Sequence, residues 1–151
     1  MIHCGANKIH VNFVDPSLAS AATTAGITCD TKTYNYLLCS LCCDSQANTT
    51  LLPSAFELQQ ADTTDATAFA TIAGYVSGTD YTLPTESRVA SNPNSYMLGI
   101  SLVGKKRYFR VVAAAHATTT EVASSWFQLY RAETTPEGVN ETNCEMSYWG
   151  N

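Results

Sequence analysis

Apolar and polar residues alternate along much of this chain, with the period at which successive side chains of a β-strand point to opposite faces. The clearest stretch is 95–103, where Tyr96, Leu98, Ile100 and Leu102 alternate with Met97, Gly99, Ser101 and Val103. The same period predicts strands at 8–14, 34–43, 55–60, 106–115 and 122–131, and a short, broken strand at 69–76. In the first strand we expect Ile9, Val11 and Phe13 on the inner face and His10 on the outer face.

Polar turns separate these strands, and no window favours a helix. Residues 44–50, 62–65 and 78–80 have the composition of turns, and 84–94 is a loop with two prolines. The Ala-rich stretch 61–73 carries Thr, a weak helix former, at every turn. Because Gly104-Lys105 forms a short connection, we expect the strands at 95–103 and 106–115 to pair as a hairpin.

About eight short strands predict an all-β fold, an antiparallel β-sandwich or jelly roll. The chain has 151 residues, 45% of them hydrophobic, which is enough for one domain with a buried core. We expect that β-sandwich domain at 1–133, with 1–7 as an N-terminal arm, and an extended C-terminal tail at 134–151.

Charged residues are scarce. They make up 14% of the chain, against roughly 25% in an average soluble domain. Neutral, Thr-rich surfaces are typical of secreted adhesive modules and of subunits whose faces are covered by neighbours, and the composition leaves both open. The net charge of −5 argues against a dedicated nucleic-acid binder. Since no apolar run approaches a membrane span and the N-terminus lacks a signal sequence, we expect a soluble protein that is not exported and has no membrane partner.

Four of the eight basic residues lie within six positions: Lys105, Lys106, Arg107 and Arg110. They could contact an acidic surface on a protein partner. Alternatively, they form a charged hairpin tip that keeps a strand end soluble and blunts edge pairing. Contact with nucleic-acid phosphates is the least favoured reading, because the chain as a whole is acidic.

No arrangement of residues predicts a reaction. The motif Cys39-Ser-Leu-Cys42 has the spacing of half a zinc site, but in a strand these two cysteines point to opposite faces, so buried free thiols are favoured over a metal site or a disulfide. The histidines, His3, His10 and His116, lie in no nucleophile motif. Asp62-Thr-Thr-Asp65 lacks the glycine and closing Glu of a calcium loop. We therefore predict no metal, no cofactor and no enzymatic activity.

Four segments together resemble a known family. They are Tyr34-Asn35-Tyr36-Leu37, Phe56-Glu57-Leu58-Gln59-Gln60-Ala61-Asp62, Gly104-Lys105-Lys106-Arg107-Tyr108-Phe109-Arg110 and Leu129-Tyr130-Arg131-Ala132-Glu133. Their order over 28–135 resembles that of small proteins encoded in head-gene clusters of tailed phages and prophages. In that family a "KLQ-S-D" strand precedes a "G-K-R-Y-R" strand and an "L-S-R-A-E" end.

The resemblance implies a virion structural protein, a cement or decoration protein made in the host cytoplasm. Such a protein binds the outside of the major-capsid lattice, often as a homotrimer, and stabilises the head without catalysis. On this reading Lys105, Lys106, Arg107 and Arg110 contact the capsid, and Tyr148 and Trp149 in the tail anchor on an adjacent subunit.

A carbohydrate-binding or adhesion module of a phage tail or fibre is the alternative. In such a module, exposed aromatic rings stack on sugars, and Tyr75, Tyr81, Tyr96 and Trp126 are candidates. Trp126 lies in Ser125-Trp126-Phe127-Gln128-Leu129, where a core position is favoured over an exposed platform.

Overall fold

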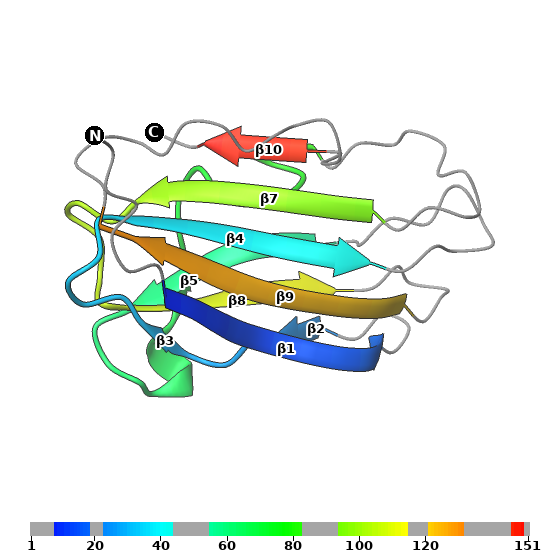
Figure 1. Cartoon of the computed structure of the whole chain (residues 1–151), viewed down its shortest axis with the longest axis horizontal. Coiled ribbons are helices and arrows are strands. Elements are labelled where there is room, and N and C mark those ends of the chain that lie inside the picture. The colour runs from blue at the N-terminus through cyan, green and yellow to red at the C-terminus, as the bar shows by residue number, and fades with distance from the viewer. Residues whose placement is uncertain are drawn as a thin grey trace.

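The chain folds into two β-sheets packed face to face, with sheet A in front of sheet B in Figure 1. The computed structural model describes residues 8–18, 23–43, 55–82, 94–114, 121–131 and 146–149. Sheet A contains, in order across the sheet, β1 (Lys8–Leu18), β9 (Glu121–Tyr130), β4 (Tyr36–Cys43), β7 (Asn94–Ser101) and β10 (Met146–Trp149). Sheet B contains β2 (Thr23–Ala25), β8 (Tyr108–Ala114), β5 (Ala55–Ala61) and β6 (Ala70–Thr71), with β3 (Cys29–Asp30) also paired to β8. The predicted all-β sandwich is confirmed.

The strands pair in a nested order along the chain. β1 pairs with β9, β2 with β8, β4 with β7 and β5 with β6, each pair antiparallel. Two further antiparallel pairs, β4 with β9 and β5 with β8, join these into the two sheets. The chain therefore runs as one long two-stranded ribbon, and successive pairs of that ribbon lie in alternate sheets.

This order makes the predicted hairpin between 95–103 and 106–115 wrong. β7 lies in sheet A and β8 in sheet B, so the connection between them crosses from one sheet to the other. The turn at Gly104-Lys105 exists, but a short turn is compatible both with a hairpin and with a crossing between packed sheets. Each of the two strands finds its partners elsewhere in the chain.

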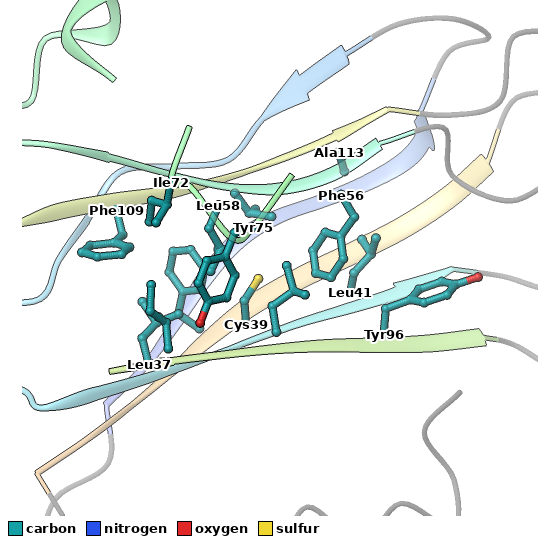
Figure 2. Packing of buried hydrophobic residues seen from close by; sticks show 14 of the residues in the cluster. Leu37, Cys39, Leu41, Phe56, Leu58, Ile72, Tyr75, Tyr96, Phe109 and Ala113 are labelled. Atoms are coloured by element: carbon teal, nitrogen blue, oxygen red, sulfur yellow. The ribbon is translucent and has the colours of Figure 1, made fainter. Parts of the chain in front are cut away.

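The core lies between the sheets, where alternate residues of both inner faces interdigitate (Figure 2). Sheet A contributes Leu37, Cys39, Leu41, Tyr96, Leu98, Ile100, Phe127 and Leu129, and sheet B contributes Phe56, Leu58, Phe109, Val111 and Ala113. Ile72 and Tyr75 join from the segment after β6, and the Tyr75 hydroxyl donates to the Gly99 carbonyl at 2.6 Å. Burial of each large apolar side chain contributes about 1.5–3 kcal/mol to stability.

β1 presents the opposite face from the one that its pattern predicts. Ile9 and Val11 are exposed, at 65% and 52%, whereas His10 stacks on the core residue Phe127 and Asn12 is buried. The pairing of β1 with β9 shifts register between Val11 and Phe13, which marks a bulge at Asn12. The expectation that Ile9 and Val11 face inward and His10 outward was therefore wrong, and the side chain of Phe13 lies outside what the structure describes.

The segment after β5 is less regular than its pattern predicts. Only Ala70–Thr71 of the predicted strand at 69–76 pairs with β5, and the chain then turns at Gly74, where φ is 88°. Ahead of β6, η1 (Ala66–Ala68) is a single 3₁₀ turn within a stretch expected to contain no helix. The Asp65 carboxylate begins this turn because its Oδ1 accepts from the Thr67 amide at 2.9 Å.

Met146–Trp149, from the predicted C-terminal tail, form β10. This strand pairs in parallel with β7, and Tyr148 and Trp149 have Leu98 and Gly99 as their register partners. These four residues thus extend sheet A of their own chain. Their side chains, like residues 1–7, lie outside what the structure describes.

A buried polar link joins the bulge of β1 to the middle of sheet A. The Asn12 side-chain amide donates to Ser125 Oγ at 3.0 Å, and Ser125 Oγ donates to the Ser40 carbonyl at 2.7 Å. Both side chains are fully buried. Because polar groups in a core are costly when unpaired, this link ties β1, β9 and β4 into one register.

Replacing Ser125 with Ala is expected to lower the free energy of unfolding by ~1–3 kcal/mol, because it leaves the Asn12 amide and the Ser40 carbonyl without this hydroxyl. Urea denaturation followed by tryptophan fluorescence measures the change. Ser124→Ala, the neighbouring position on the outer face, serves as the control and should change stability by less than about 0.5 kcal/mol. Equal effects of the two substitutions would contradict the link.

Candidate functional site

Two turns of similar geometry face each other at one end of the sandwich. In the first, the Tyr34 amide donates to the Thr31 carbonyl at 3.1 Å, and in the second the Lys105 amide donates to the Leu102 carbonyl at 3.1 Å. The third residue has positive φ in both turns, 79° at Thr33 and 73° at Gly104. Type II turns require this conformation, which glycine adopts freely but a β-branched residue adopts only with strain.

Backbone hydrogen bonds fix these turns to the strand ends. The Leu102 amide donates to the Asn35 carbonyl at 2.7 Å, and the Asn35 amide donates to the Tyr130 carbonyl at 2.9 Å. The Thr31 amide and hydroxyl both donate to the Arg107 carbonyl, at 3.0 and 2.7 Å. The start of β4 and the ends of β7 and β9 therefore meet at the same end of the sandwich as the start of β8, at the left of Figure 1.

Between the turns lies a depression of about 300 Å³ lined by Thr31, Lys32, Thr33, Tyr34, Leu102, Lys105, Lys106 and Arg107. Arg131 reaches its wall from the end of β9: a guanidinium nitrogen donates to Thr33 Oγ1 at 2.9 Å, and the guanidinium lies 5.0 Å from the centre of the Tyr34 ring. Five of the eight basic residues of the chain thus surround one depression: Lys32, Lys105, Lys106, Arg107 and Arg131. We call this region the basic end.

Two of these cations are held by carboxylates. Arg107 donates to both oxygens of Asp30, at 2.9 and 2.6 Å, and Asp30 Oδ1 also accepts from the Lys32 amide at 3.0 Å. The hydrogen bond from Arg107, followed by the one from the Lys32 amide, lowers the pKa of Asp30 to about 2. Lys106 Nζ lies 3.1 Å from Asp62 Oδ2, and both of these side chains are largely exposed. The ion pairs hold two basic side chains in fixed positions without neutralising the whole end.

Lys32 and Lys105 form no ion pair with any carboxylate among the described residues. Together with Arg131, whose contacts among the described residues are a hydroxyl and an aromatic ring, they give the described part of the basic end a positive excess on a chain of net charge −5. A cleft rimmed by ammonium and guanidinium groups binds carboxylates or other anions, and its attraction falls as salt increases.

The structure brings together only part of the predicted contact set. Lys105, Lys106 and Arg107 all line the depression. Arg110 does not: it lies on the outer face of sheet B, where its Nε donates to Gln59 Oε1 at 2.7 Å and its guanidinium lies 4.3 Å from the centre of the Phe69 ring. The side chains of Tyr148 and Trp149 lie outside the described residues.

Lys32, Thr33 and Arg131 are site residues that sequence reasoning missed. They come from segments about 70 and 25 positions away from the 105–107 cluster, and the nested pairing is what places them beside it. The sequence signal that could have found them is their place at the ends of predicted strands. Lys32 precedes one strong strand and Arg131 ends another, so both mark strand ends that could share one edge of the sandwich.

The described side chains offer little for nucleophilic or metal chemistry. Burial raises the pKa of the Cys29 thiol to about 11 and also raises the pKa of Cys39, so neither is a thiolate at neutral pH. All four described cysteines are free, and Cys39 and Cys42 lie on opposite faces of β4 as expected. Within the described ranges, no group of three or more His, Cys, Asp or Glu side chains is placed to hold a metal ion.

Comparison with known proteins assigns no family to this chain. No protein-family model matches this chain, and a search of curated proteins finds no match. Among the described elements, no helix is long and apolar enough to cross a membrane. The resemblance to phage head proteins therefore stays a prediction.

The aromatic side chains named for sugar binding lie mostly in the core. Tyr75 and Tyr96 are fully buried, and Tyr81 is buried with its hydroxyl bonded to the Phe56 carbonyl. Trp126 was expected in the core, but it lies half-buried on the outer face of sheet A, because the inner positions of β9 are Ser125 and Phe127. Three of the four candidates thus have no ring face available to a sugar.

Replacing Arg107 with Gln is expected to return the pKa of Asp30 from about 2 toward 3.8, since the charged hydrogen bonds are the main cause of the shift. Because the pKa is lower in the folded state, the pair's contribution to stability is present above the unfolded-state pKa of 3.8, complete by about pH 5, and lost as the pH falls through about 2. NMR titration of the side-chain carboxyl carbons measures this change. Lys106→Gln, which removes the partner of Asp62, is the control and should leave Asp30 unchanged.

One substitution in each of the two turns should change the free energy of unfolding in opposite directions. Gly104→Ala is expected to lower the free energy of unfolding by ~1–2 kcal/mol, because the space is open and only the left-handed backbone opposes the new Cβ. Thr33→Gly is expected to raise it by up to ~1 kcal/mol through relief of the same strain. Thermal unfolding of both variants tests this, and destabilisation by Thr33→Gly would show that its bond to Arg131 outweighs the strain.

Proposed function

We propose that this chain is a virion structural protein that binds the outside of a major-capsid lattice through its basic end and stabilises the head without catalysing a reaction. The observation that carries the proposal is the gathering of five of the eight basic residues around one depression of an acidic chain. A surface of this kind selects acidic protein partners and disfavours basic ones.

The strand order supports a jelly roll as the finer description of the fold. A jelly roll has eight strands in two sheets formed by two Greek keys, and it occurs in viral capsid proteins and lectins. β1, β2, β4, β5, β6, β7, β8 and β9 pair first with last and second with second-last, as expected of a ribbon wrapped into that fold. Because one fold serves many functions, the strand order bears on the fold, and the charges of the basic end are what select a partner.

The basic end presents its charges from turns that backbone hydrogen bonds join to the strand ends. Asp30 and Asp62 orient two of the basic side chains, while Lys32 and Lys105 stay available for a partner's carboxylates. Each such exposed contact contributes only ~0.2–1 kcal/mol. A lattice that repeats the same acidic site, or a linked set of copies, multiplies these weak contacts into durable attachment.

A carbohydrate-binding module is the weaker alternative. It needs exposed aromatic rings, and Tyr75, Tyr81 and Tyr96 are buried. The positive charge of the basic end also has no role in binding a neutral sugar. Of the four aromatic side chains named for sugar binding, this leaves Trp126, half-buried on the outer face of sheet A.

Co-sedimentation with empty shells, assembled from the major capsid protein encoded in the same genome, tests the proposal. We expect Lys32→Gln combined with Lys105→Gln to weaken binding about 10-fold at low salt, with a smaller difference at 0.5 M salt, where surface charges are screened.

Single substitutions at two positions provide a matched comparison. Lys105→Gln removes a charge at the depression, whereas Arg110→Gln removes one on the outer face of sheet B. Only the first should weaken binding. Equal affinity of the wild-type protein and the double variant at every salt concentration would overturn the proposed contact, and failure of the wild-type protein to bind any shell would overturn the proposed function.

A further inference from the structure

Val103 is the most exposed of the large apolar side chains that the structure describes. It is 78% exposed and lies in the turn at 102–105, which follows β7 at the left of Figure 1. Turns usually carry Gly, Pro, Asn, Asp or Ser, which suit the turn backbone or water. A Cβ built on Gly104 would meet no atom within 4 Å apart from its chain neighbours, so the turn stands clear of the sandwich. The core therefore gains nothing from the apolar character of Val103.

Val103 belongs to the basic end. Leu102 and Lys105, which flank it in the same turn, both line the depression. The other exposed aliphatic side chains among the described residues lie on β1 or beside it: Ile9, Val11 and Ile27. An apolar turn tip thus stands next to a ring of cations, away from those three side chains.

Lys105 links the apolar tip to the charges around it. Among the described residues its ammonium has no carboxylate partner, whereas Lys106 lies 3.1 Å from Asp62 and Arg107 is held by Asp30. The first and last Cα atoms of such a turn lie within about 7 Å of each other. A partner that places a carboxylate on Lys105 therefore also brings its own surface against Val103.

Ionic contacts alone would attach this end weakly. Exposed ion pairs contribute little each, and salt at physiological strength screens charges beyond about 8 Å. Specific interfaces combine an apolar core with a polar rim, and contacts around the core exclude water from it. The basic end has this arrangement on a small scale, with Val103 as its apolar point and Lys32 and Lys105 as available rim charges.

We propose that Val103 is the apolar anchor of the basic end: it inserts into an apolar recess on an acidic protein surface, whose rim carboxylates pair with Lys32 and Lys105. This inference rests on the proposed attachment to a capsid lattice and adds the chemistry of the partner's surface. The positive excess of the basic end selects an acidic rim, and the exposed branched side chain selects an apolar recess. A second copy of this end is itself positive, and a phosphate or sulfate ion has no apolar part for Val103 to contact.

Val103→Lys separates an apolar anchor from a purely ionic contact. The substitution adds a cation to the basic end, so an ionic contact alone predicts tighter binding to empty shells at low salt. An apolar recess predicts the opposite, because an ammonium group loses its hydration there, and we expect binding to weaken about 10-fold. Co-sedimentation with shells of the major capsid protein encoded in the same genome measures the change.

Val103→Thr tests the same contact without a change of charge or shape. Its hydroxyl would enter the recess without a hydrogen-bond partner, so we expect binding to weaken by roughly 5- to 10-fold. This loss should be the same at low salt and at 0.5 M salt, because screening does not act on an apolar contact. The loss caused by Lys32→Gln combined with Lys105→Gln should instead shrink as salt increases.

Val11→Lys and Val11→Thr are the matched controls. They make the same changes at an exposed valine on the outer face of sheet A, and they should leave shell binding unchanged. Circular dichroism and thermal unfolding establish that all four variants are folded. Tighter binding by Val103→Lys, or wild-type affinity of Val103→Thr, would overturn the anchor while the proposed function stands. Failure of the wild-type protein to bind any shell would overturn both, so the two failures are distinguishable.

Discussion

The nested pairing of strands is the constraint on which the rest of this structure depends. Because β1 pairs with β9, and β4 lies between β9 and β7, the middle of sheet A is built from segments close to a hundred residues apart in the chain. That arrangement closes the core between the sheets. It also carries the turns at 31–34 and 102–105 to the same end as Arg131. The core and the basic end are thus two consequences of a single set of backbone hydrogen bonds.

The sandwich separates charged and uncharged surfaces by location. Charge gathers at one end, where long side chains reach into solvent, while the described side chains on the outer face of sheet A are uncharged. An ionic contact weakens as salt screens it, whereas an apolar contact does not.

The sequence pattern predicts the strands that are buried on one face, and it fails where that condition does not hold. β4, β5 and β7 appear close to their predicted bounds because their inner positions are consistently apolar. In β1, Ile9 and Val11 lie outside and His10 and Asn12 inside, so alternation alone selects the wrong face for the part of the strand before the bulge. The contiguous cluster at 105–107 is visible in the sequence. Lys32 and Arg131 join it only through pairing between distant strands, which local periodicity does not report.

The strain at Thr33 bears on how the basic end is built. Gly104 shows that the same kind of turn can be made with a residue that tolerates positive φ, so the fold does not require Thr at the equivalent position. What glycine lacks is the hydroxyl that accepts from Arg131 and keeps its guanidinium over Tyr34. Free arginine side chains lose ~2 kcal/mol of rotamer entropy when a partner fixes them. A turn that holds Arg131 in place before binding moves part of that cost into the folded state, at the expense of local strain.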